Sequence, residues 1–468
     1  MPPKVLHSLA ELYQHIDIHE HKSISFHHHL RNGDFVLNMV LKQYEVQKVE
    51  HLHLYPSSIF PAYTGILPLL EHRQIDNITT NYMNGVVATY LSKHGLPGEL
   101  RMQTHGGRAR NIIDGTSKID IAYLAAPCVD SHGNAIGSLG PSRCGSLGYA
   151  VPDSKHANIT VLITDNLIDG TLDTPDIHGQ DVDYIVVVDQ IGDPQGIVSG
   201  TTTITTNPIN VKIARDTARL LDELGYIKPG FSYQSGAGGT SLRVTKDIRD
   251  IMRNNNVKAS FFSGGITGYH VQMLEEGLVE TLYDVQCFDT EAVDSLSRNE
   301  NHIAIDASQY ANPMNPNRII KDLDIVILGA TEMDLDFNVN VTTDSHQTII
   351  GGSGGHSDTA SDSKICVIVA PLLRSRLSLI QDRVTTITTL GKHVDALVTE
   401  RGIAINPIRK DLVDRLNNTT LPIKTIHQLQ QEAYRLTGIP KNTKKESHVI
   451  GVIEDRTQDI IDSLYQTD

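Results

Sequence analysis

An internal repeat constrains the fold of this chain more than any other feature of its sequence. Residues 119–135, IDIAYLAAPCVDSHGNA, align without gaps with residues 323–339, LDIVILGATEMDLDFNV. A glycine-rich stretch follows each copy, GSLGPSRCGSLG at 137–148 and GGSGGHSDTA at 351–360, and then Ser-Lys and an apolar segment. We therefore predict two related halves. The identical pairs are Asp120 and Asp324, Ile121 and Ile325, Leu124 and Leu328, Ala126 and Ala330, Asp130 and Asp334, and Asn134 and Asn338.

Short runs rich in Val and Ile predict the strands of a parallel sheet. Examples are NITVLITDN, DYIVVVDQI and SKICVIVAPLL, which are apolar at successive positions and bounded by turn residues. Parallel strands buried on both faces have this pattern. The stretch 207–226 has apolar residues at helical spacing, with Pro208 near its start and Gly225 near its end, as expected of a helix. Strands alternating with helices indicate an α/β fold with mainly parallel sheets.

The repeat, and the change in sequence pattern after residue 400, suggest three units. We expect one α/β domain over residues 1–228 and a second over 229–400, joined near GYIKPGF at 225–231. DLVDRLNN and KTIHQLQQEAYRLTG look like surface helices, and KNTKKESH at 441–448 is a polar, basic break. We therefore predict a helical C-terminal appendage over residues 401–468.

Composition and charge exclude several classes of protein. The formal net charge of −15 argues against a nucleic-acid-binding surface, which needs clustered Lys and Arg. The start of the chain, MPPKVLHSLAELYQ, lacks the apolar region of a signal peptide, and no apolar run approaches the roughly 20 residues of a membrane span. The cysteines are expected to be buried, reduced thiols. The sequence predicts a cytoplasmic protein that binds neither nucleic acid nor membranes.

The most unusual stretch is IIGGSGGHSDTA at 349–360, which has four glycines within five positions. It matches neither a phosphate-binding Gly-Lys-Ser/Thr loop nor a dinucleotide-binding fingerprint. The free backbone N–H groups of such a loop can stabilise an anion or a developing oxyanion, and a tight turn without a ligand is the alternative. Similar stretches are THGGRARNI at 104–112, FSYQSGAGGTS at 231–241 and FFSGGITGYH at 261–270. Because loops at the carboxyl ends of parallel strands line the usual ligand site, we predict one site lined by several of these stretches.

A histidine-rich stretch, SFHHHLRNGD at 25–34, is a second candidate for function. One interpretation is a polar site lining in which Arg31 binds a carboxylate through two hydrogen bonds. A structural histidine cluster is the second interpretation. A metal site is the third, because His27 and His29 would share one face of a strand, as would His51 and His53. No cysteine or carboxylate cluster completes such a metal site, and none is predicted.

Together these motifs resemble the alpha subunit of citrate lyase. SFHHHLRNGD, THGGRARNI, IDIAYLAAPCVDSHGNA, GATEMDLDFNVNVTTDS and IIGGSGGHSDTA occur in the order found in that family, and the resemblance runs from about residue 23 to about residue 408. The family belongs to the CoA-transferase group, whose architecture of two related α/β domains agrees with the repeat.

The resemblance implies a transferase and a set of partners. In the family, citrate replaces the acetyl group carried on an acyl-carrier protein and acetate is released. A beta subunit then cleaves the citryl thioester to oxaloacetate and regenerates the acetyl form. With free CoA esters the family member acts as a citrate CoA-transferase. The implied partners are the citrate lyase beta subunit, the acyl-carrier gamma subunit, citrate and acetyl-CoA. No tightly bound cofactor is implied, because CoA or the phosphoribosyl-dephospho-CoA arm of the acyl-carrier subunit is the carrier.

One departure from the CoA-transferase pattern bears on the mechanism. Many CoA-transferases use a Glu in a Ser-Glu-Asn-Gly motif as a covalent nucleophile. The matching stretch here is Ser263-Gly264-Gly265, which has no carboxylate. This predicts that the citrate carboxylate attacks the acetyl thioester directly, that a mixed anhydride forms, and that the freed thiolate then attacks the citryl carbonyl. Such a route depends on positioning and on oxyanion donors.

The resemblance and the loops together suggest residue roles. We expect the loop of 351–355 to offer amides to the thioester oxygen or the carrier arm, with His356 as a hydrogen-bond donor. Glu332 is the one carboxylate that could replace the missing nucleophile, although capping or loop structure explains it as well. The predicted catalytic residues are Gly351, Gly352, Gly354, Gly355, His356 and Glu332. The residues predicted to bind the acyl carrier or CoA are Gly236, Ala237, Gly238, Gly239, Gly264 and Gly265. The residues predicted to bind citrate are His29, Arg31 and Arg108.

For other residues, a structural explanation competes with a functional one. Asp130 and Asn134, and their counterparts Asp334 and Asn338, are expected to close a loop through side-chain-to-backbone hydrogen bonds. The basic run Lys441, Lys444 and Lys445 could dock an acidic carrier protein, but a solvated charge run is the usual explanation. Two other functions stay open for the whole chain: an acyl-CoA hydrolase or a CoA-transferase for another acid, and a non-catalytic sensor or scaffold on the same fold.

Overall fold

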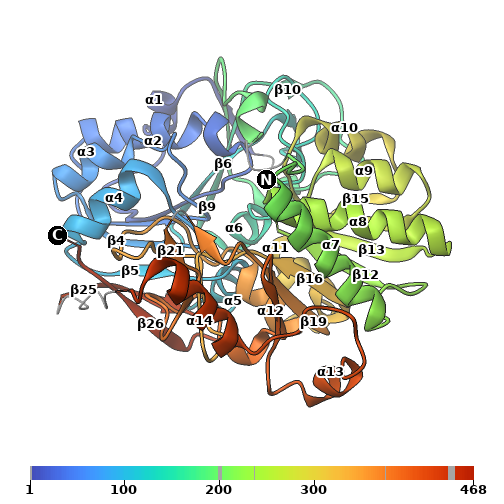
Figure 1. The fold of residues 1–468 in the computed structure, drawn as a ribbon. Coiled ribbons are helices and arrows are strands. Elements are labelled where there is room, and N and C mark those ends of the chain that lie inside the picture. Colours follow the sequence, from blue (N-terminus) through green and yellow to red (C-terminus); the bar gives the residue numbers. More distant parts are fainter. Residues whose placement is uncertain (1–2, 199–202, 237, 375, 441–447, 468) are drawn as a thin grey trace.

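The computed structural model of the chain describes residues 3–198, 203–236, 238–374, 376–440 and 448–467. Two large, mainly parallel sheets form the molecule, as predicted from the repeat. In Figure 1 the first half runs from blue to cyan, and the second half runs from green to orange and packs beside it. One apolar core cluster includes residues of both sheets.

The first sheet has ten strands in the order β1-β11-β9-β6-β2-β3-β4-β5-β25-β26, and every neighbouring pair is parallel except β25 and β26. Its strands are β1 (Lys4–Leu6), β2 (Ser23–Phe26), β3 (Leu52–Pro56), β4 (Ile75–Thr80), β5 (Leu100–Met102), β6 (Ile121–Ala125), β9 (Ile159–Thr164), β11 (Tyr184–Val187), β25 (Val449–Glu454) and β26 (Ile460–Tyr465). The α-helices of this half are α1 (Leu9–Leu12), α2 (Val36–Val46), α3 (Ile66–Glu71), α4 (Gly85–His94), α5 (His105–Ile113) and α6 (Val151–His156).

The second sheet has eight strands in the order β15-β14-β13-β12-β16-β19-β23-β24, parallel except for β23 and β24. Its strands are β12 (Ser232–Ser235), β13 (Ala259–Ile266), β14 (Val279–Cys287), β15 (His302–Ala304), β16 (Ile325–Leu328), β19 (Ile365–Val369), β23 (Ala396–Thr399) and β24 (Gly402–Ile405). The α-helices that follow α6 are α7 (Pro208–Glu223), α8 (Gly239–Asn255), α9 (Gly268–Glu275), α10 (Thr290–Arg298), α11 (Ala307–Ala311), α12 (His356–Asp362), α13 (Lys410–Arg415) and α14 (Ile426–Thr437).

The two halves share one topology. The order β11-β9-β6-β2-β3-β4-β5 in the first sheet matches β23-β19-β16-β12-β13-β14-β15 in the second. Each half also has a small three-stranded sheet, which begins directly after β6 in the first half and directly after β16 in the second. The small sheets consist of β7 (Cys128–Asp130), β8 (Ala135–Ile136) and β10 (Leu167–Ile168), and of β17 (Glu332–Asp334), β18 (Val339–Asn340) and β22 (Ile380–Gln381). Short elements complete the chain: 3₁₀ turns Arg31–Gly33, Gly179–Asp181, Pro194–Ile197, Ile319–Asp322 and Gly391–His393, and the hairpin β20 (Leu373–Arg374) and β21 (Leu377–Ser378).

The repeated Asp and Asn residues close equivalent loops, as expected from the sequence. Asp130 accepts hydrogen bonds from the backbone N–H and the side-chain amide of Asn134, at 2.9 and 2.8 Å. Asp334 accepts the same two bonds from Asn338, at 2.9 and 3.1 Å. Both pairs therefore shape the hairpins β7–β8 and β17–β18 rather than a ligand site.

The structure corrects two of the expected unit boundaries. Helix α7 packs against α8, β19 and β23 of the second half, so the join between the halves lies before α7 and not at residue 228. The range 401–468 contains α13 and α14, but it is not purely helical. It begins with β24 in the second sheet, and the hairpin β25–β26 adds to the first sheet beside β5 (Figure 1). The last residues of the chain therefore return to the first half.

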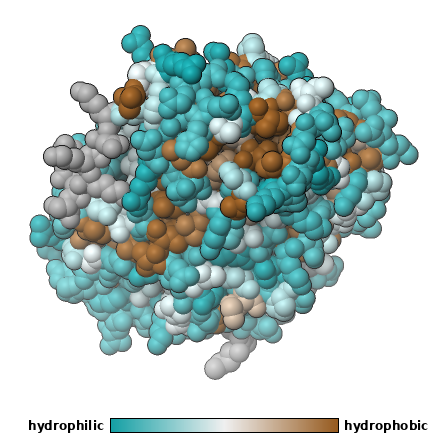
Figure 2. Space-filling view, turned by 60° about the horizontal axis from the view of Figure 1, so that its bottom comes forward, coloured by the Kyte–Doolittle hydropathy of each residue, from teal (hydrophilic) through white to brown (hydrophobic). Residues whose placement is uncertain are grey.

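The surface is mostly hydrophilic with apolar patches. Figure 2 shows these patches on the side that faces downward in Figure 1. Exposed apolar side chains on and after the C-terminal helix include Leu436 and Ile439, and Leu377 on β21, which packs against α14, is also exposed. No helix within the described ranges combines the length and the apolar character needed to cross a membrane.

Candidate active site

The candidate site lies where the carboxyl ends of the two sheets meet. In the first half the sequence continues from β2 into the histidine stretch, and in the second half β14 ends just before Phe288. The side chains of His28 and Gln286 join these two places, with 3.1 Å between Nε2 and Oε1. Gln286 also donates to the backbone carbonyl of His28, at 3.1 Å. Strand ends of both halves are thus in direct contact, as expected for a ligand site of this fold.

The glycine loop of the second half crosses to the first half. The carbonyl of Gly354 accepts the N–H of His105 at 2.9 Å, and the N–H of Gly354 donates to the carbonyl of Asn81 at 3.1 Å. Gly354 has φ of +51°, a conformation that glycine adopts at no steric cost. The loop therefore lies against the ends of β4 and β5, and most of its neighbours belong to the other half.

Two of the four predicted amide donors in this loop are already used. The N–H of Gly351 donates to the carbonyl of Thr342 at 3.1 Å, and Gly354 donates to Asn81. These two amides are not available to an oxyanion, which corrects the prediction for them. The N–H groups of Gly352 and Gly355 have no acceptor among the residues that the structure describes. Gly352 is buried, whereas Gly355 keeps accessible surface, so Gly355 is the better placed donor.

Tyr310 and Gln234 connect the glycine loop of 351–355 to the glycine stretch of 261–270. A Cβ atom on Gly355 would lie 2.6 Å from the Tyr310 hydroxyl. That hydroxyl accepts a hydrogen bond from Gln234 Nε2 at 2.7 Å, and Gln234 in turn accepts one from Ser263 at 3.1 Å. Gly264 has φ of +97°, and a Cβ there would lie 2.6 Å from Gln234 Nε2. The two glycine stretches therefore border one site.

Arg31 lies in this site with an unpaired charge. Its guanidinium carbon is 5.2 Å from the centre of the Phe60 ring and 5.0 Å from that of Phe288. Within the described part of the chain it forms no ion pair, and its buried Nη1 has no hydrogen-bond partner. Burial lowers the pKa of Arg31 from its usual value. A Cβ on Gly265 would overlap the Phe288 ring, so Gly265 allows this ring to reach the arginine.

Arg108, the other predicted citrate ligand, has a structural role. Its two terminal nitrogens bind the carboxylate of Asp153 at 2.8 and 2.7 Å, and one of them also donates to the carbonyl of Tyr55 at 2.9 Å. Both charged side chains are buried. The ion pair holds α5 against α6. Because both terminal nitrogens of Arg108 are engaged by Asp153, they cannot form a two-bond contact with a substrate carboxylate, and the prediction for Arg108 is wrong.

The histidine stretch forms a stack of aromatic rings. The ring of His28 lies 6.0 Å from that of His29, 4.9 Å from Tyr149 and 5.7 Å from His105. Burial, reinforced by the neighbouring histidines and Arg31, lowers the pKa of His28 well below its usual range. His28 also bonds Ser57 through Nδ1, at 2.6 Å. The stack agrees with the interpretation of a structural histidine cluster.

His29 does not reach the site surface. It is fully buried, and its Nε2 accepts the backbone N–H of Tyr149 at 3.1 Å. Its Nδ1 is also buried, with no partner in the described residues. Burial, followed by the charges of His27 and His105, lowers the pKa of His29 well below its usual range. Because His29 has no accessible surface, its ring cannot contact citrate in this structure, which corrects the prediction for His29.

The histidines do not form a metal centre. Across the residues that the structure describes, no three His, Cys, Asp or Glu side chains come together in a group that could hold a metal ion. His51 pairs with Asp76 at 2.9 Å near the surface, and His53 contacts Thr79 at 2.9 Å.

His105 is a residue of the site that the sequence reasoning missed. It directly follows the N-cap Thr104 at the start of α5, between the His28 ring and Gly354. In the stretch THGGRARNI, only the glycines and arginines attract attention in the sequence. A histidine at the first position of a helix that follows a strand is a signal that could have identified it, because such positions face the ligand site.

Glu332 and His356 are also structural. The carboxylate of Glu332 accepts hydrogen bonds from Asn340 at 2.9 Å and from the backbone and hydroxyl of Thr385 at 2.8 and 3.1 Å. His356 contacts Thr389 through Nδ1 at 2.8 Å and the Gly329 carbonyl through Nε2 at 2.9 Å. Burial lowers the pKa of His356 to about 4. Because the polar atoms of both side chains are engaged, neither catalytic prediction fits the structure.

The remaining predicted carrier-binding residues lie at the start of α8. The N–H of Gly236 donates to Ile327 at 2.8 Å, and Gly238 is the exposed N-cap of α8, without a side-chain capping bond. Gly239 begins the helix. The first amides of a helix have no internal acceptors and favour anions. Ala237 and the basic residues Lys441, Lys444 and Lys445 lie outside the described residues.

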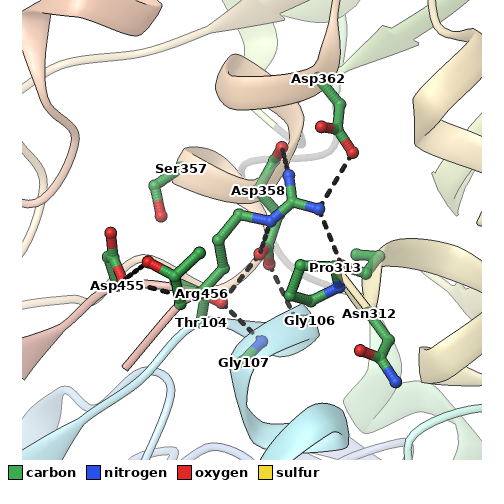
Figure 3. A network of polar contacts seen from close by, with 12 residues as sticks. Thr104, Gly106, Gly107, Asn312, Pro313, Ser357, Asp358, Asp362, Asp455 and Arg456 are labelled. Atoms are coloured by element: carbon green, nitrogen blue, oxygen red, sulfur yellow. Dashed lines mark hydrogen bonds and ion pairs between the residues drawn. The ribbon is translucent and has the colours of Figure 1, made fainter. Parts of the chain in front are cut away.

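A polar clamp holds the glycine loop from behind (Figure 3). The carboxylate of Asp358, two residues into α12, accepts hydrogen bonds from the Thr104 hydroxyl at 2.8 Å and from the Gly106 N–H at 2.9 Å. Arg456, just after β25, donates to the Asp358 carbonyl at 3.0 Å and to Asp362 at 3.0 Å. Burial raises the pKa of Asp358 to about 6. The clamp joins α5, α12 and the C-terminal hairpin, and thereby fixes His105 against the loop.

Two cavities lie next to the site rather than in it. One of about 310 Å³ borders the clamp and is lined by Ser357, Lys392 and Arg456 among others. The Ser357 hydroxyl is 2.8 Å from that of Ser353 in the glycine loop, so this cavity reaches the back of the loop. The other, of about 470 Å³, lies between the halves and is lined by residues that include Lys155 and His302.

Comparison with known proteins identifies the family. The family model for the alpha subunit of citrate lyase matches residues 3–467. The chain belongs to the citrate lyase alpha-subunit family. The citrate lyase alpha chain of Klebsiella pneumoniae is 41% identical over 463 residues, which is 99% of this chain and 91% of that protein. A solved alpha subunit of citrate lyase from Streptococcus mutans, in complex with citrate, has a TM-score of 0.97 at 41% identity, with 100% of this chain and 92% of that chain covered.

A more distant structure shares the fold. The 4-hydroxybutyrate CoA-transferase of Porphyromonas gingivalis has a TM-score of 0.57 at 15% identity, with 92% of this chain and 97% of that chain covered. The predicted CoA-transferase-like fold is thus confirmed.

Proposed function

We propose that this chain exchanges acyl groups on a thioester carrier, as the alpha subunit of a citrate lyase. Acetyl thioester and citrate give citryl thioester and acetate. The observation that carries the proposal is Arg31, a cation with no carboxylate partner among the described residues, which lies between Phe60 and Phe288 beside the glycine stretches. A planar guanidinium pairs with a carboxylate through two hydrogen bonds. The citrate in the Streptococcus mutans relative supports the same substrate.

The exchange proceeds by direct attack. A carboxylate oxygen of citrate attacks the acetyl carbonyl carbon, the C–S bond breaks, and the carrier leaves as a thiolate. The mixed anhydride that results is attacked by the thiolate at the citryl carbonyl, and its C–O bond breaks to release acetate. Two observations support this route over a covalent enzyme intermediate: Ser263-Gly264-Gly265 has no carboxylate, and the oxygens of Glu332 are engaged by Asn340 and Thr385.

Membership of the family supports a proposal for the carrier and the partners. We propose that the acyl group arrives on CoA or on the phosphoribosyl-dephospho-CoA arm of an acyl-carrier subunit. Its phosphates would bind at the open N-terminus of α8, at Gly238 and Gly239, because helix N-termini favour anions. A beta subunit would then cleave the citryl thioester in a shared, cytoplasmic complex.

Acyl exchange by the purified chain tests the proposal. Incubation with acetyl-CoA and citrate should give citryl-CoA and acetate, which mass spectrometry detects, and hydroxylamine added with acetyl-CoA alone should trap no enzyme adduct. An adduct would overturn the direct mechanism. Turnover with water or another acid, but not with citrate, would overturn the choice of substrate. Stabilisation by citrate without any exchange would favour a sensor.

The Arg31→Met variant tests the binding role. Loss of one buried, charge-assisted contact should reduce kcat/KM for citrate by roughly 10²-fold or more, mostly through KM. The control is Arg143→Met, which removes an arginine whose ion pair with Asp294 is solvent-exposed. Equal activity of the two variants would contradict the role of Arg31.

A further inference from the structure

His105 has a ring nitrogen directed to the site that no protein group occupies. Its Nδ1 lies 2.8 Å from the side-chain Nδ2 of Asn81. No hydrogen bond to its Nε2 is found among the described residues, and that atom is not one of the enclosed unpartnered ones. A Cβ on Gly354 would lie 3.2 Å from Nε2. Nε2 is therefore next to the glycine loop, and His105 keeps part of its surface accessible.

The other histidines of the stack cannot replace it. His28 has both ring nitrogens bonded, to Ser57 and Gln286. His27 bonds the Ala125 carbonyl at 3.0 Å through Nε2, and its Nδ1 is enclosed. His29 is enclosed as well. Of the four, His105 alone combines an unoccupied nitrogen with access to the site, within the described part of the chain.

Asn81 determines which nitrogen of His105 carries the proton. With Nδ2 of Asn81 facing the ring, Nδ1 of His105 accepts and the proton of the neutral ring is on Nε2, because an amide nitrogen only donates. Asn81 is fully buried, and its Oδ1 has no partner among the described residues, so the contact with His105 alone sets the orientation of this amide, which the NMR measurement below tests. Burial, together with the charge of Arg108, lowers the pKa of His105 to about 3. At neutral pH the ring is therefore an uncharged donor whose N–H faces the glycine loop.

We propose that His105 is a catalytic residue whose Nε2–H donates a hydrogen bond to the acyl oxygen of the thioester. The proposal rests on the acyl exchange proposed above. When the carboxylate attacks, the carbonyl π electrons move to that oxygen, and it becomes an oxyanion. The hydrogen bonds of His105 and of the Gly355 amide strengthen as this charge develops. When the C–S bond breaks, the electrons return to form the carbonyl of the anhydride. No proton is transferred, and the neutral imidazole is regenerated unchanged.

A neutral imidazole fits this step better than a charged one. An imidazolium would pair with the citrate carboxylate in the ground state and lower its nucleophilicity. A neutral donor interacts most strongly with the oxyanion, which exists only around the transition state. Arg31 supplies the charge for citrate binding, so the two functions are divided between two residues.

Three substitutions separate donation from packing. His105→Phe keeps a ring against His28 and Tyr149 but has no donor, and it should lower kcat for exchange by roughly 10²–10³-fold with little change in the KM for citrate. His105→Gln places an amide N–H near the position of Nε2 and should retain activity within about tenfold of the original. His105→Ala should match His105→Phe in rate. If His105→Phe retained kcat within about threefold, the proposal would be overturned.

A matched control removes a half-buried histidine outside the site. His53 stacks on Tyr55 with 4.0 Å between ring centres, and burial lowers its pKa to about 4, so His53→Phe makes the same chemical change within β3. Its exchange rate should equal that of the original chain. If His53→Phe and His105→Phe reduced kcat equally, the effect of His105 would be structural. Citrate binding, followed as a shift of the thermal unfolding midpoint, should persist in His105→Phe.

The tautomer can be measured without turnover. In a ¹⁵N-histidine NMR spectrum, the His105 signals should report a proton on Nε2 at pH 7, and His105→Gln assigns them. A proton on Nδ1 would make Nε2 an acceptor and overturn the proposal. Failure of the original chain to exchange citrate would instead contradict the proposed function, which the NMR result does not depend on.

Discussion

The molecule makes the same contact twice between its halves, with different residues. After its small sheet, each half sends a glycine-containing loop across to the other sheet. In one crossing, the carbonyl of Gly148 accepts the N–H of Ala307 at 2.9 Å, and in the other the carbonyl of Gly354 accepts the N–H of His105, also at 2.9 Å. Ala307 begins α11 and His105 begins α5. We call these the 148 crossing and the 354 crossing.

The 148 crossing is closed by local and apolar contacts. A Cβ on Gly148 would overlap the Ile305 carbonyl and lie 2.8 Å from Val285. The N-terminus of α11 is capped by its own residues, because Asp306 and Gln309 exchange side-chain-to-backbone hydrogen bonds. Such a capping box needs no other segment. This crossing therefore packs the halves together, and the cap of α11 is complete without a third segment.

The 354 crossing depends on charged groups from three segments. Thr104 caps α5, but its hydroxyl donates to Asp358 of α12, which is in turn held by Arg456 of the C-terminal hairpin. The first residue of α5 is His105, whereas the first residue of α11 is Ala307. The two crossings therefore share one duplicated backbone arrangement. In the 148 crossing it packs the halves together, and in the 354 crossing, on our proposal, it also holds catalytic groups.

Acidification should break the 354 crossing before the 148 crossing, and this is the largest effect that we predict. The folded pKa of His27 is about 4 and that of His105 about 3, against 6.5 unfolded. The unfolded chain therefore binds more protons below pH 6.5, so stability is present above that pH and is lost as the pH falls. At pH 5 each of these two histidines should cost about 2 kcal/mol of unfolding free energy, and His28 and His29 add to the loss.

Asp358 acts in the opposite direction in the same pH range. Its folded pKa of about 6 lies above the ordinary 3.8, so the folded state gains a proton first and is stabilised by about 1 kcal/mol at pH 5. The histidine effect should exceed this gain. Hydrogen exchange, corrected for the intrinsic rate, should show that residues 351–360 lose more protection between pH 7 and pH 5 than residues 137–148. Equal loss in both segments would contradict the prediction.

The sequence contained the fold but not the partners of its polar side chains. The two halves were visible because Asp130 and Asn134 recur as Asp334 and Asn338, and identical local loops preserve such residues. The return of β25 to β5 was not visible, since strand pairing between residues 451 and 100 leaves no periodic signal in either segment. Helix α7 was assigned to the wrong half for the same reason: amphipathic spacing shows a buried face but not what buries it.

The same limit applies to the site residues: their distant partners are not visible in the sequence. Arg31 stands out in the sequence because it follows three histidines in SFHHHLRNGD, and its role in binding citrate stays a prediction. Arg108, Glu332 and His356 were overestimated, because the groups that engage them, Asp153, Thr385 and Thr389, lie 33 to 53 residues away. Composition and spacing cannot reveal such pairs. Functional and structural polar residues look alike in a sequence until their partners are known.

Removing Arg456 should weaken the 354 crossing specifically. Asp358 is fully buried, and breaking a buried ion pair by removing one partner destabilises a protein by about 3–5 kcal/mol. Arg456→Met should therefore lower the unfolding free energy by about this amount, measured by urea unfolding, and also slow acyl exchange. Asp358→Asn in the same chain should restore part of the stability, because no unpaired buried charge remains.

The 148 crossing offers a control for this variant. Arg143, in the loop of that crossing, pairs with Asp294 at 2.9 Å, and both side chains are 40–45% exposed. Exposed pairs contribute roughly 0–1 kcal/mol, so Arg143→Met should leave stability and exchange nearly unchanged. A loss as large as that of Arg456→Met would remove the distinction between the crossings.

The smallest effect that we predict comes from adding a methyl group to one glycine of each crossing. Gly148→Ala forces a Cβ into the backbone of Ile305, which cannot move aside, whereas Gly355→Ala meets the Tyr310 side chain, with its hydroxyl at 2.6 Å and two ring carbons at 3.3 and 3.4 Å. Overpacking costs about 1–3 kcal/mol, and we expect Gly148→Ala at or above the upper end and Gly355→Ala near the lower. Tyr310→Phe removes the clash but also the acceptor of Gln234, so Gly355→Ala should cost less stability in the Tyr310→Phe background than in the original chain, measured by thermal unfolding. The exchange rate should not recover, because the added methyl still blocks the approach of the acyl oxygen to the amide. If Gly355→Ala with Tyr310→Phe exchanged acyl groups at the original rate, the loop would serve only to join the halves, as its counterpart does in the 148 crossing.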